Sequence, residues 1–125
     1  MERELPHPDT SLFDTGTNKY ERCGVIVLED DGTHSIVELP NRSPVKTKHF
    51  VVWNMDIHKL VPPDAEIVGV IHTHPFRSSP LPSSDDVAAI PGELIGMVYH
   101  PSTTSVSWYD RNGIIEHHQR TKKRR

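Results

Sequence analysis

The sequence predicts a single α/β (α+β) domain, built on a mixed, mostly antiparallel β-sheet with flanking helices. Short runs rich in apolar and β-branched residues recur along the chain, and turn-forming residues separate them. Only two short segments have helical character. A length of 125 residues suits one hydrophobic core. Together these observations predict a small sheet-based domain.

The strand-like runs follow one another from residue 23 onward. We expect strands at residues 23–28, 35–39, 49–52, 66–71, 94–99, 105–109 and 114–116. Asp30-Asp31-Gly32 predicts a hairpin turn between the first two strands. Arg111-Asn112-Gly113 predicts the turn that leads into the last one. Most neighbouring strands are therefore expected to be antiparallel.

Two helices are expected beside the sheet. Residues 55–60 form the first, and residues 87–90 belong to the start of the second. Ser83 has the side chain of an N-cap, and Pro91 ends this helix. In that register Asp86 occupies the third helical position, where an acidic or amide side chain closes a capping box.

His72-Thr73-His74-Pro75 directly follows the buried strand at residues 66–71 and predicts a metal site. On an extended strand, residues two apart point to the same face, so both imidazoles can reach one ion. Pro75 ends the strand because it has no N–H to donate to a neighbour. The two histidines are therefore expected at the exit of a rigid element.

A carboxylate a short distance along the chain is the expected third ligand. A catalytic zinc ion commonly has three protein ligands and leaves its fourth position to water. Asp86 fits best because it lies in register with Ser83 and precedes the apolar helix face, and Asp85 is the alternative. Two acidic residues at this position would also stabilise a helix N-terminus without any metal.

These residues together resemble the JAMM motif of the MPN+ (JAB domain) metalloproteases, His-x-His-Pro followed by Ser-x-x-Asp. A second match begins at Glu21, where Glu21-Arg22-Cys23-Gly24 resembles the start of the family's first core strand. Glu38-Leu39-Pro40-Asn41-Arg42-Ser43 resembles the stretch after its second strand. The resemblance covers roughly residues 20–109 and indicates a compact prokaryotic or phage-type member with the MPN fold.

The resemblance implies a role for each motif residue. His72, His74 and Asp86 would bind one catalytic zinc ion per chain. Glu21 would move a proton from the zinc-bound water to the leaving amine, and Ser83 would stabilise the oxyanion. The sequence departs from the family at two points: Asp85 fits the commonest spacer length better than Asp86, and turn-like residues replace the long helix that often precedes Glu21.

The implied function is hydrolysis of an amide bond in a flexible protein tail by a zinc-dependent metallopeptidase or isopeptidase. A ubiquitin-like or sulfur-carrier protein conjugate is one candidate substrate. A phage tail-assembly or cell-wall peptidase module is an alternative, and a non-catalytic MPN scaffold for protein interactions is another. The chain has little room for the insertions with which eukaryotic members grip ubiquitin.

Composition predicts something of the protein's partners, its cellular compartment and the ends of its chain. A net charge of −3 predicts no general affinity for nucleic acid. A lone cysteine, Cys23, and the lack of an apolar leader or membrane-length segment favour the cytoplasm. The core is expected at about residues 12–116, between a mobile N-terminal segment at residues 1–8 and a mobile, basic C-terminal tail at residues 117–125. The loop at residues 76–81 is a candidate for binding a peptide by strand addition.

Overall fold

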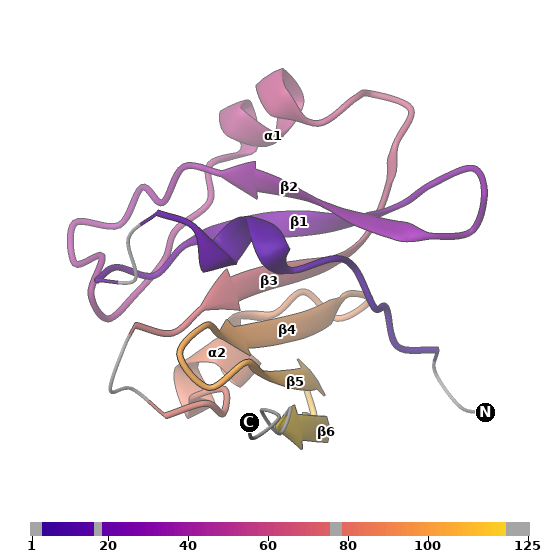
Figure 1. Ribbon diagram of the computed structural model, residues 1–125. Coiled ribbons are helices and arrows are strands. Elements are labelled where there is room, and N and C mark those ends of the chain that lie inside the picture. The colour runs from indigo at the N-terminus through magenta and orange to yellow at the C-terminus, as the bar shows by residue number, and fades with distance from the viewer. Residues whose placement is uncertain (1–3, 17–18, 76–78, 120–125) are drawn as a thin grey trace.

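The computed structural model describes residues 4–16, 19–75 and 79–119, and it shows a six-stranded sheet with few helices (Figure 1). The strands lie in the order β2-β1-β3-β4-β5-β6. Only β3 and β4 are parallel among these neighbours, so the predicted α+β class with a mostly antiparallel sheet is confirmed. The strands are β1 Cys23–Leu28, β2 His34–Leu39, β3 Glu66–Thr73, β4 Ile95–His100, β5 Ser105–Asp110 and β6 Gly113–Gln119. The helices are η1 Ser11–Asp14, α1 Asn54–Leu60 and α2 Ser84–Ala89.

The two predicted turns are confirmed. Glu29 donates its backbone N–H to the Thr33 carbonyl at 2.8 Å, and Gly32 between them has a φ of 90°. Gly113 closes the β5–β6 turn with a φ of 123°. Both values lie in the left-handed region that glycine enters at little cost, which is why these positions reverse the chain.

One face of the sheet is covered by η1 and the segment before it. In Figure 1, η1 lies in front of the strands. Its Phe13 packs with Ile26, Ile71 and Met97 in the largest apolar cluster. We expected residues 4–8 to be mobile, but the Pro6 carbonyl accepts a hydrogen bond of 2.8 Å from the Trp108 indole, so this segment lies against the same face.

The opposite face carries α1 and α2, and its apolar side chains form two separate clusters. Val61, after α1, packs with Val25, Val27 and Leu39. The second cluster comprises Ile90, Val98 and Tyr109, with Val70 and Val87 beside them. Since strand side chains alternate, His72 shares this face with Val70, two residues before it in β3. The parallel connection from β3 to β4 contains α2, which is how α2 comes to lie near the end of β3.

The predicted strand at residues 49–52 is wrong: these residues form a loop. The reason is that their backbone groups bind within the loop. The Asn41 amide donates to the His49 carbonyl at 3.0 Å and accepts from the Val51 N–H at 3.1 Å. Val51 in turn accepts from the Arg42 N–H at 2.9 Å. A side chain thus replaces a neighbouring strand as the hydrogen-bonding partner.

Two expectations concern parts of the chain that the structure describes incompletely. The strand-addition loop includes residues 76–78, and the basic tail includes residues 120–125, and both ranges lie outside the described residues. Residues 117–119, which we had assigned to the tail, belong to β6. Within the described parts of the chain, none of the helices has the length and apolar character needed to cross a membrane.

Candidate metal centre

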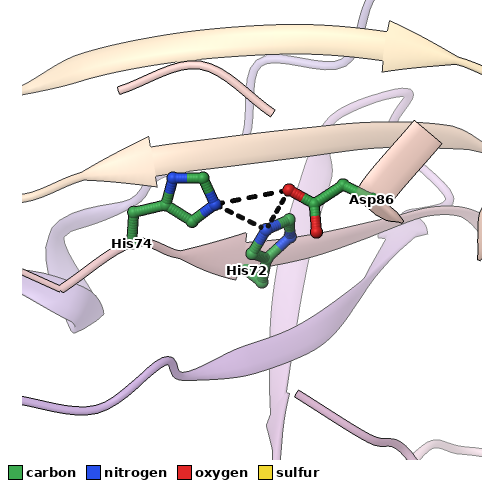
Figure 2. A group of neighbouring side chains, drawn as sticks. All are labelled: His72, His74 and Asp86. Carbon is green, nitrogen blue, oxygen red and sulfur yellow. Dashed lines mark hydrogen bonds and ion pairs between the residues drawn. The ribbon is translucent and has the colours of Figure 1, made fainter. Parts of the chain in front are cut away.

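Two histidines and one aspartate converge at the end of β3 (Figure 2). The Nε2 atoms of His72 and His74 are 3.2 Å apart. A single carboxylate oxygen, Oδ2 of Asp86, lies 3.2 Å from the His72 Nε2 and 3.3 Å from the His74 Nε2. These three side chains could hold a metal ion, because each offers one ligand atom and the atoms are close together.

Asp86 is held in place by the capping box at the start of α2. Ser83 accepts a hydrogen bond of 3.1 Å from the Asp86 N–H, and its own N–H donates to Asp86 Oδ2 at 2.8 Å. The predicted N-cap is therefore confirmed, and it orients the aspartate toward β3. Asp85 is exposed and does not join the histidines. The structure thus places Asp86 rather than Asp85 beside them.

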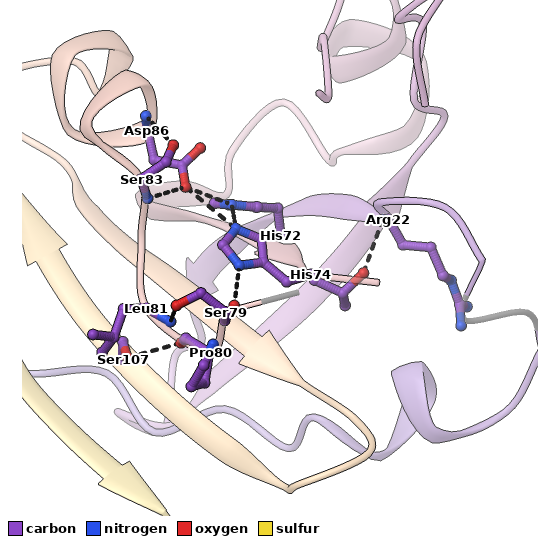
Figure 3. A network of polar contacts seen from close by, with 10 residues as sticks. Arg22, His72, His74, Ser79, Pro80, Leu81, Ser83, Asp86 and Ser107 are labelled. Atoms are coloured by element: carbon purple, nitrogen blue, oxygen red, sulfur yellow. Dashed lines mark hydrogen bonds and ion pairs between the residues drawn. The ribbon is translucent and has the colours of Figure 1, made fainter. Parts of the chain in front are cut away.

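A backbone carbonyl fixes the tautomer of His74. Its Nδ1 lies 2.6 Å from the Ser79 carbonyl oxygen, as Figure 3 shows. A carbonyl can only accept, so Nδ1 must carry the proton and donate it. In the neutral ring the Nε2 lone pair then points at His72 and Asp86. Ring orientation by a second hydrogen bond of this kind is typical of metal-binding histidines.

His72 is fully buried, and aromatic rings enclose it. The Phe50 ring stacks on its imidazole at 4.4 Å between centroids, with 23° between the planes. The Tyr109 ring meets it edge-on at 6.4 Å. Burial lowers the pKa of His72, which keeps the ring neutral and able to act as a ligand. Its Nδ1 has no hydrogen-bond partner among the described residues.

The charges of the group favour an ionised aspartate. Burial raises the pKa of Asp86, but its close contacts with the imidazoles of His72 and His74 outweigh burial and hold that pKa well below its usual range. Burial likewise lowers the pKa of His74, whereas its contacts with Asp86 and the Ser79 carbonyl raise it overall. The site therefore combines a carboxylate with two imidazoles, which is a donor set that divalent zinc and related metals accept.

Glu21 lies next to this group, just before β1. The residue is only 6% exposed, and one of its carboxylate oxygens, Oε1, has no hydrogen-bond partner among the described residues. Burial raises the pKa of Glu21 to about 7, with opposing effects from the charges of His74 and Asp86. A buried carboxyl with an unpaired oxygen that titrates near neutrality is suited to exchanging protons with a water or substrate.

Backbone hydrogen bonds fix Glu21 relative to the histidines. Its neighbour Arg22 donates its N–H to Thr73 Oγ1 at 2.9 Å and accepts from the Thr73 N–H at 2.8 Å. The Asn41 amide donates to the Glu21 carbonyl at 2.8 Å. Thr73 stands between His72 and His74 in the chain. Its hydrogen bonds with Arg22 therefore extend the β1–β3 pairing as far as Glu21 and the two histidines.

Arg22 is itself anchored outside the site. Its guanidinium makes two hydrogen bonds to Glu38, at 2.8 and 2.9 Å, and stands 5.2 Å from the centre of the Phe13 ring. A forked pair of this kind restricts the arginine more than one bond would. This explains how Glu21 keeps its position although turn-like residues, rather than a long helix, precede it.

Ser83 is exposed at the edge of the site. Its oxygen already accepts from the Asp86 N–H, so a hydroxyl hydrogen remains to donate elsewhere.

The sequence did not single out four other residues that shape the site: Asn41, Phe50, Thr73 and Ser79. Asn41 had a detectable signal, since Asn side chains in turns often bind nearby backbone. Ser79 contributes only its carbonyl, which no side-chain pattern could reveal.

Among the described residues, the Ser107 hydroxyl of β5 holds the loop that carries Ser79 (Figure 3). Ser107 donates to the Pro80 carbonyl at 3.2 Å and lies 2.6 Å from His117 Nδ1. We expect Ser107→Ala to weaken metal affinity by about tenfold, at the lower end of the effect of outer-shell changes, because His74 loses its fixed orientation. Titration with zinc against a competing chelator measures this.

Ser105→Ala is the matched control for that experiment. Ser105 lies in β5 two residues before Ser107 and is equally buried. Its hydroxyl contacts Thr103 instead of the loop that carries Ser79. Equal losses in the two variants would mean that the effect comes from the strand as a whole. An unchanged affinity in Ser107→Ala would show that the loop holds His74 without this bond.

Comparison with known proteins identifies the family of the chain. No curated protein matches the chain. The model of a protein family, described as prokaryotic homologs of the JAB domain, matches residues 13–111. This range includes β1 to β5, both histidines, Asp86, Glu21 and Ser83. The chain therefore belongs to the prokaryotic JAB domain family, as its motifs had indicated.

Proposed function

We propose that this protein is a zinc-dependent metallopeptidase or isopeptidase that hydrolyses an amide bond in a flexible protein tail. The observation that carries the proposal is the triangle of His72 Nε2, His74 Nε2 and Asp86 Oδ2, with sides of 3.2, 3.2 and 3.3 Å. The buried Glu21 beside it supports a catalytic rather than a purely structural site. Membership of the JAB domain family is consistent with both.

The size of the triangle fits zinc. Ligand atoms bound tetrahedrally at about 2.0 Å lie about 3.3 Å from one another. The three observed separations agree with this value, and two imidazoles with one carboxylate are an established zinc ligand set. Three protein ligands also leave one position open, as catalytic zinc sites do.

The side chains at the metal group have distinct roles in the proposed amide hydrolysis. A bound zinc ion would supply a Lewis acid that polarises the scissile carbonyl and lowers the pKa of water to about 7. Glu21 accepts the proton of the attacking water through its unpaired oxygen and later delivers it to the leaving amine nitrogen. The Ser83 hydroxyl donates a hydrogen bond to the developing oxyanion. His74 stays oriented by Ser79 throughout.

The proposed substrate is a protein or peptide, and a ubiquitin-like or sulfur-carrier conjugate is the candidate that we would test first. The proposed compartment is the cytoplasm, and the oligomeric state is left open. A phage tail-assembly or cell-wall peptidase would share the same site, so cleavage of ubiquitin-like fusions separates these substrates. A non-catalytic scaffold would not need the metal group at all.

Metal content is the first test. We expect about one zinc ion per chain in protein purified and dialysed without added metal, because a preorganised three-ligand site retains zinc. Inductively coupled plasma mass spectrometry gives the stoichiometry. A chain without zinc, and with no uptake when zinc is supplied, would contradict the enzyme proposal and favour the scaffold.

Glu21 should also make the metal-free protein sensitive to pH. Its folded pKa of about 7 exceeds the ordinary value of 4.5, so ionising it in the folded state costs stability. This cost is absent well below pH 4.5, builds up between about pH 4.5 and 7, where Glu21 ionises in the unfolded state before it does in the folded state, and is constant above pH 7. In the chelator-treated protein, Glu21→Gln should therefore raise the melting temperature at pH 8 and change it little at pH 5.

The control for this experiment is Glu66→Gln, which removes an exposed carboxylate from β3. It should leave the melting temperature nearly unchanged at both pH values. Differential scanning fluorimetry of both variants gives the comparison. A stabilisation by Glu21→Gln that is equal at pH 5 and pH 8 would mean that burial of the charge is not its cause.

A further inference from the structure

A cavity of about 470 Å³ opens on the sheet face that carries α1 and α2. Its walls are mostly apolar and come from both helices and from the strands beneath them, including Val25, Ile57, Ile67, Val70, Ile90 and Leu94. A volume of this size lies within the range of about 300–1,000 Å³ that is typical of small-ligand pockets. The cavity thus offers apolar surface that the described residues leave open.

The cavity separates the two apolar clusters of this face. Val25, Ile57 and Ile67 belong to the cluster beside α1, whereas Ile90 and Tyr109 belong to the one beside α2. Close packing normally joins such clusters into one core. Here α1 has seven residues and α2 has six, so neither helix is long enough to cover the sheet between them.

The cavity is continuous with the candidate metal centre. Asp86 lines its wall and also faces the two histidines. Phe50 and Tyr109, which enclose the imidazole of His72, form further parts of the wall. A group held at the histidines therefore has the cavity directly beside it. The segment at Ser79 is not part of the cavity wall, and its backbone carbonyls are occupied by contacts with His74 and Ser107.

We propose that this cavity is a specificity pocket that receives a large apolar side chain of the substrate, from the residue adjoining the scissile bond. The inference rests on the proposed peptidase function and adds the substrate class to it. Burial of an apolar side chain in such a pocket is favourable because it removes apolar surface from water. Asp85 is also one of the lining residues, so its negative charge would repel an acidic side chain there.

Binding of metal-directed probes tests the pocket without requiring turnover. The probes are the N-acetylated hydroxamates of glycine, leucine, phenylalanine and aspartate, in which the hydroxamate binds zinc and only the side chain varies. Isothermal titration of the zinc-loaded protein should show at least tenfold tighter binding of the leucine and phenylalanine compounds than of glycine, and the weakest binding for aspartate. Equal affinities, or no binding by any of the four, would overturn the proposal.

Two neighbouring alanines of α2 provide a matched pair of variants. Ala89 lines the cavity, whereas Ala88 is similarly exposed but is not part of its wall. Ala89→Trp should fill the pocket and abolish the preference for leucine and phenylalanine, while glycine hydroxamate binds as before. Ala88→Trp should keep the full preference. Loss of the preference in both variants, or in neither, would count against the assignment of the pocket.

A peptide library completes the test and separates the two proposals. With the zinc-loaded protein, cleavage sites should be enriched in leucine, isoleucine, methionine or phenylalanine on one side of the broken bond. Cleavage with no such enrichment would overturn the pocket and leave the peptidase function standing. No cleavage of any peptide, together with side-chain-dependent hydroxamate binding, would overturn the function and leave the pocket standing.

Discussion

Glu21→Gln should lower turnover by about 10²–10⁴-fold while one zinc ion per chain remains bound. The range is what a positioned general acid–base group contributes. Glutamine has nearly the same shape but cannot accept and return a proton. Glu21 is not one of the three side chains that converge on the metal position, so zinc content should not change. Single-turnover cleavage assays and metal analysis on the same preparation measure both quantities.

Glu38→Gln is the control for this experiment, because it tests whether loss of any nearby carboxylate lowers activity. Glu38→Gln alters the neighbouring carboxylate, which binds Arg22 rather than facing the histidines. It should lower activity far less than Glu21→Gln does. A Glu21→Gln protein with full activity would assign the proton transfer to another group. A variant that loses zinc as well as activity would place Glu21 in the metal site itself.

Asp86→Ala should weaken zinc affinity by more than about 100-fold, whereas Asp85→Ala should leave it nearly unchanged. Loss of a direct ligand should exceed the 10–100-fold effect of changes in its supporting residues. Asp86 Oδ2 lies 3.2 and 3.3 Å from the two histidine nitrogens, while Asp85 is exposed beside it. Competition with a zinc chelator, followed spectroscopically, gives the two affinities.

The capping box makes a third variant useful here. Asp86 also accepts from the Ser83 N–H, so its removal disturbs the start of α2 as well as the metal group. Asp86→Asn keeps a side-chain oxygen for the cap but removes the charge. It should therefore lose most of the zinc affinity and little thermal stability. Zinc loss from Asp85→Ala instead of from the Asp86 variants would show that the neighbouring aspartate is the ligand.

The strands were predictable wherever apolar alternation and turn residues agreed. The bounds of β1 were predicted without error, and Gly32 and Gly113 marked both hairpin turns. The failure at residues 49–52 has a definite cause, because local sequence shows β-forming residues but not the Asn41 side chain that binds their backbone. Tertiary contacts of this kind override local preference.

The candidate site also has features that the sequence could predict and features that it could not. The spacing of His72 and His74 and the Ser83 cap were sufficient to select the residues that the structure brings together with Asp86. The bond from Ser79 to His74 and the stacking of Phe50 on His72 were not predictable, because neither leaves a pattern in the sequence. The apolar cavity was equally hidden, since it results from two helices being too short to meet.

The pairing of Arg22 with Thr73 has a consequence for how the site comes into existence. These residues are 51 positions apart in the chain, and their hydrogen bonds hold Glu21 close to the two histidines. A nascent or unfolded chain can present His72 and His74 together, but it cannot present Glu21 with them until the central strands have paired. Contacts of such long sequence separation form late and slowly. In the proposed enzyme, the metal ligands would therefore come together before Glu21 joins them.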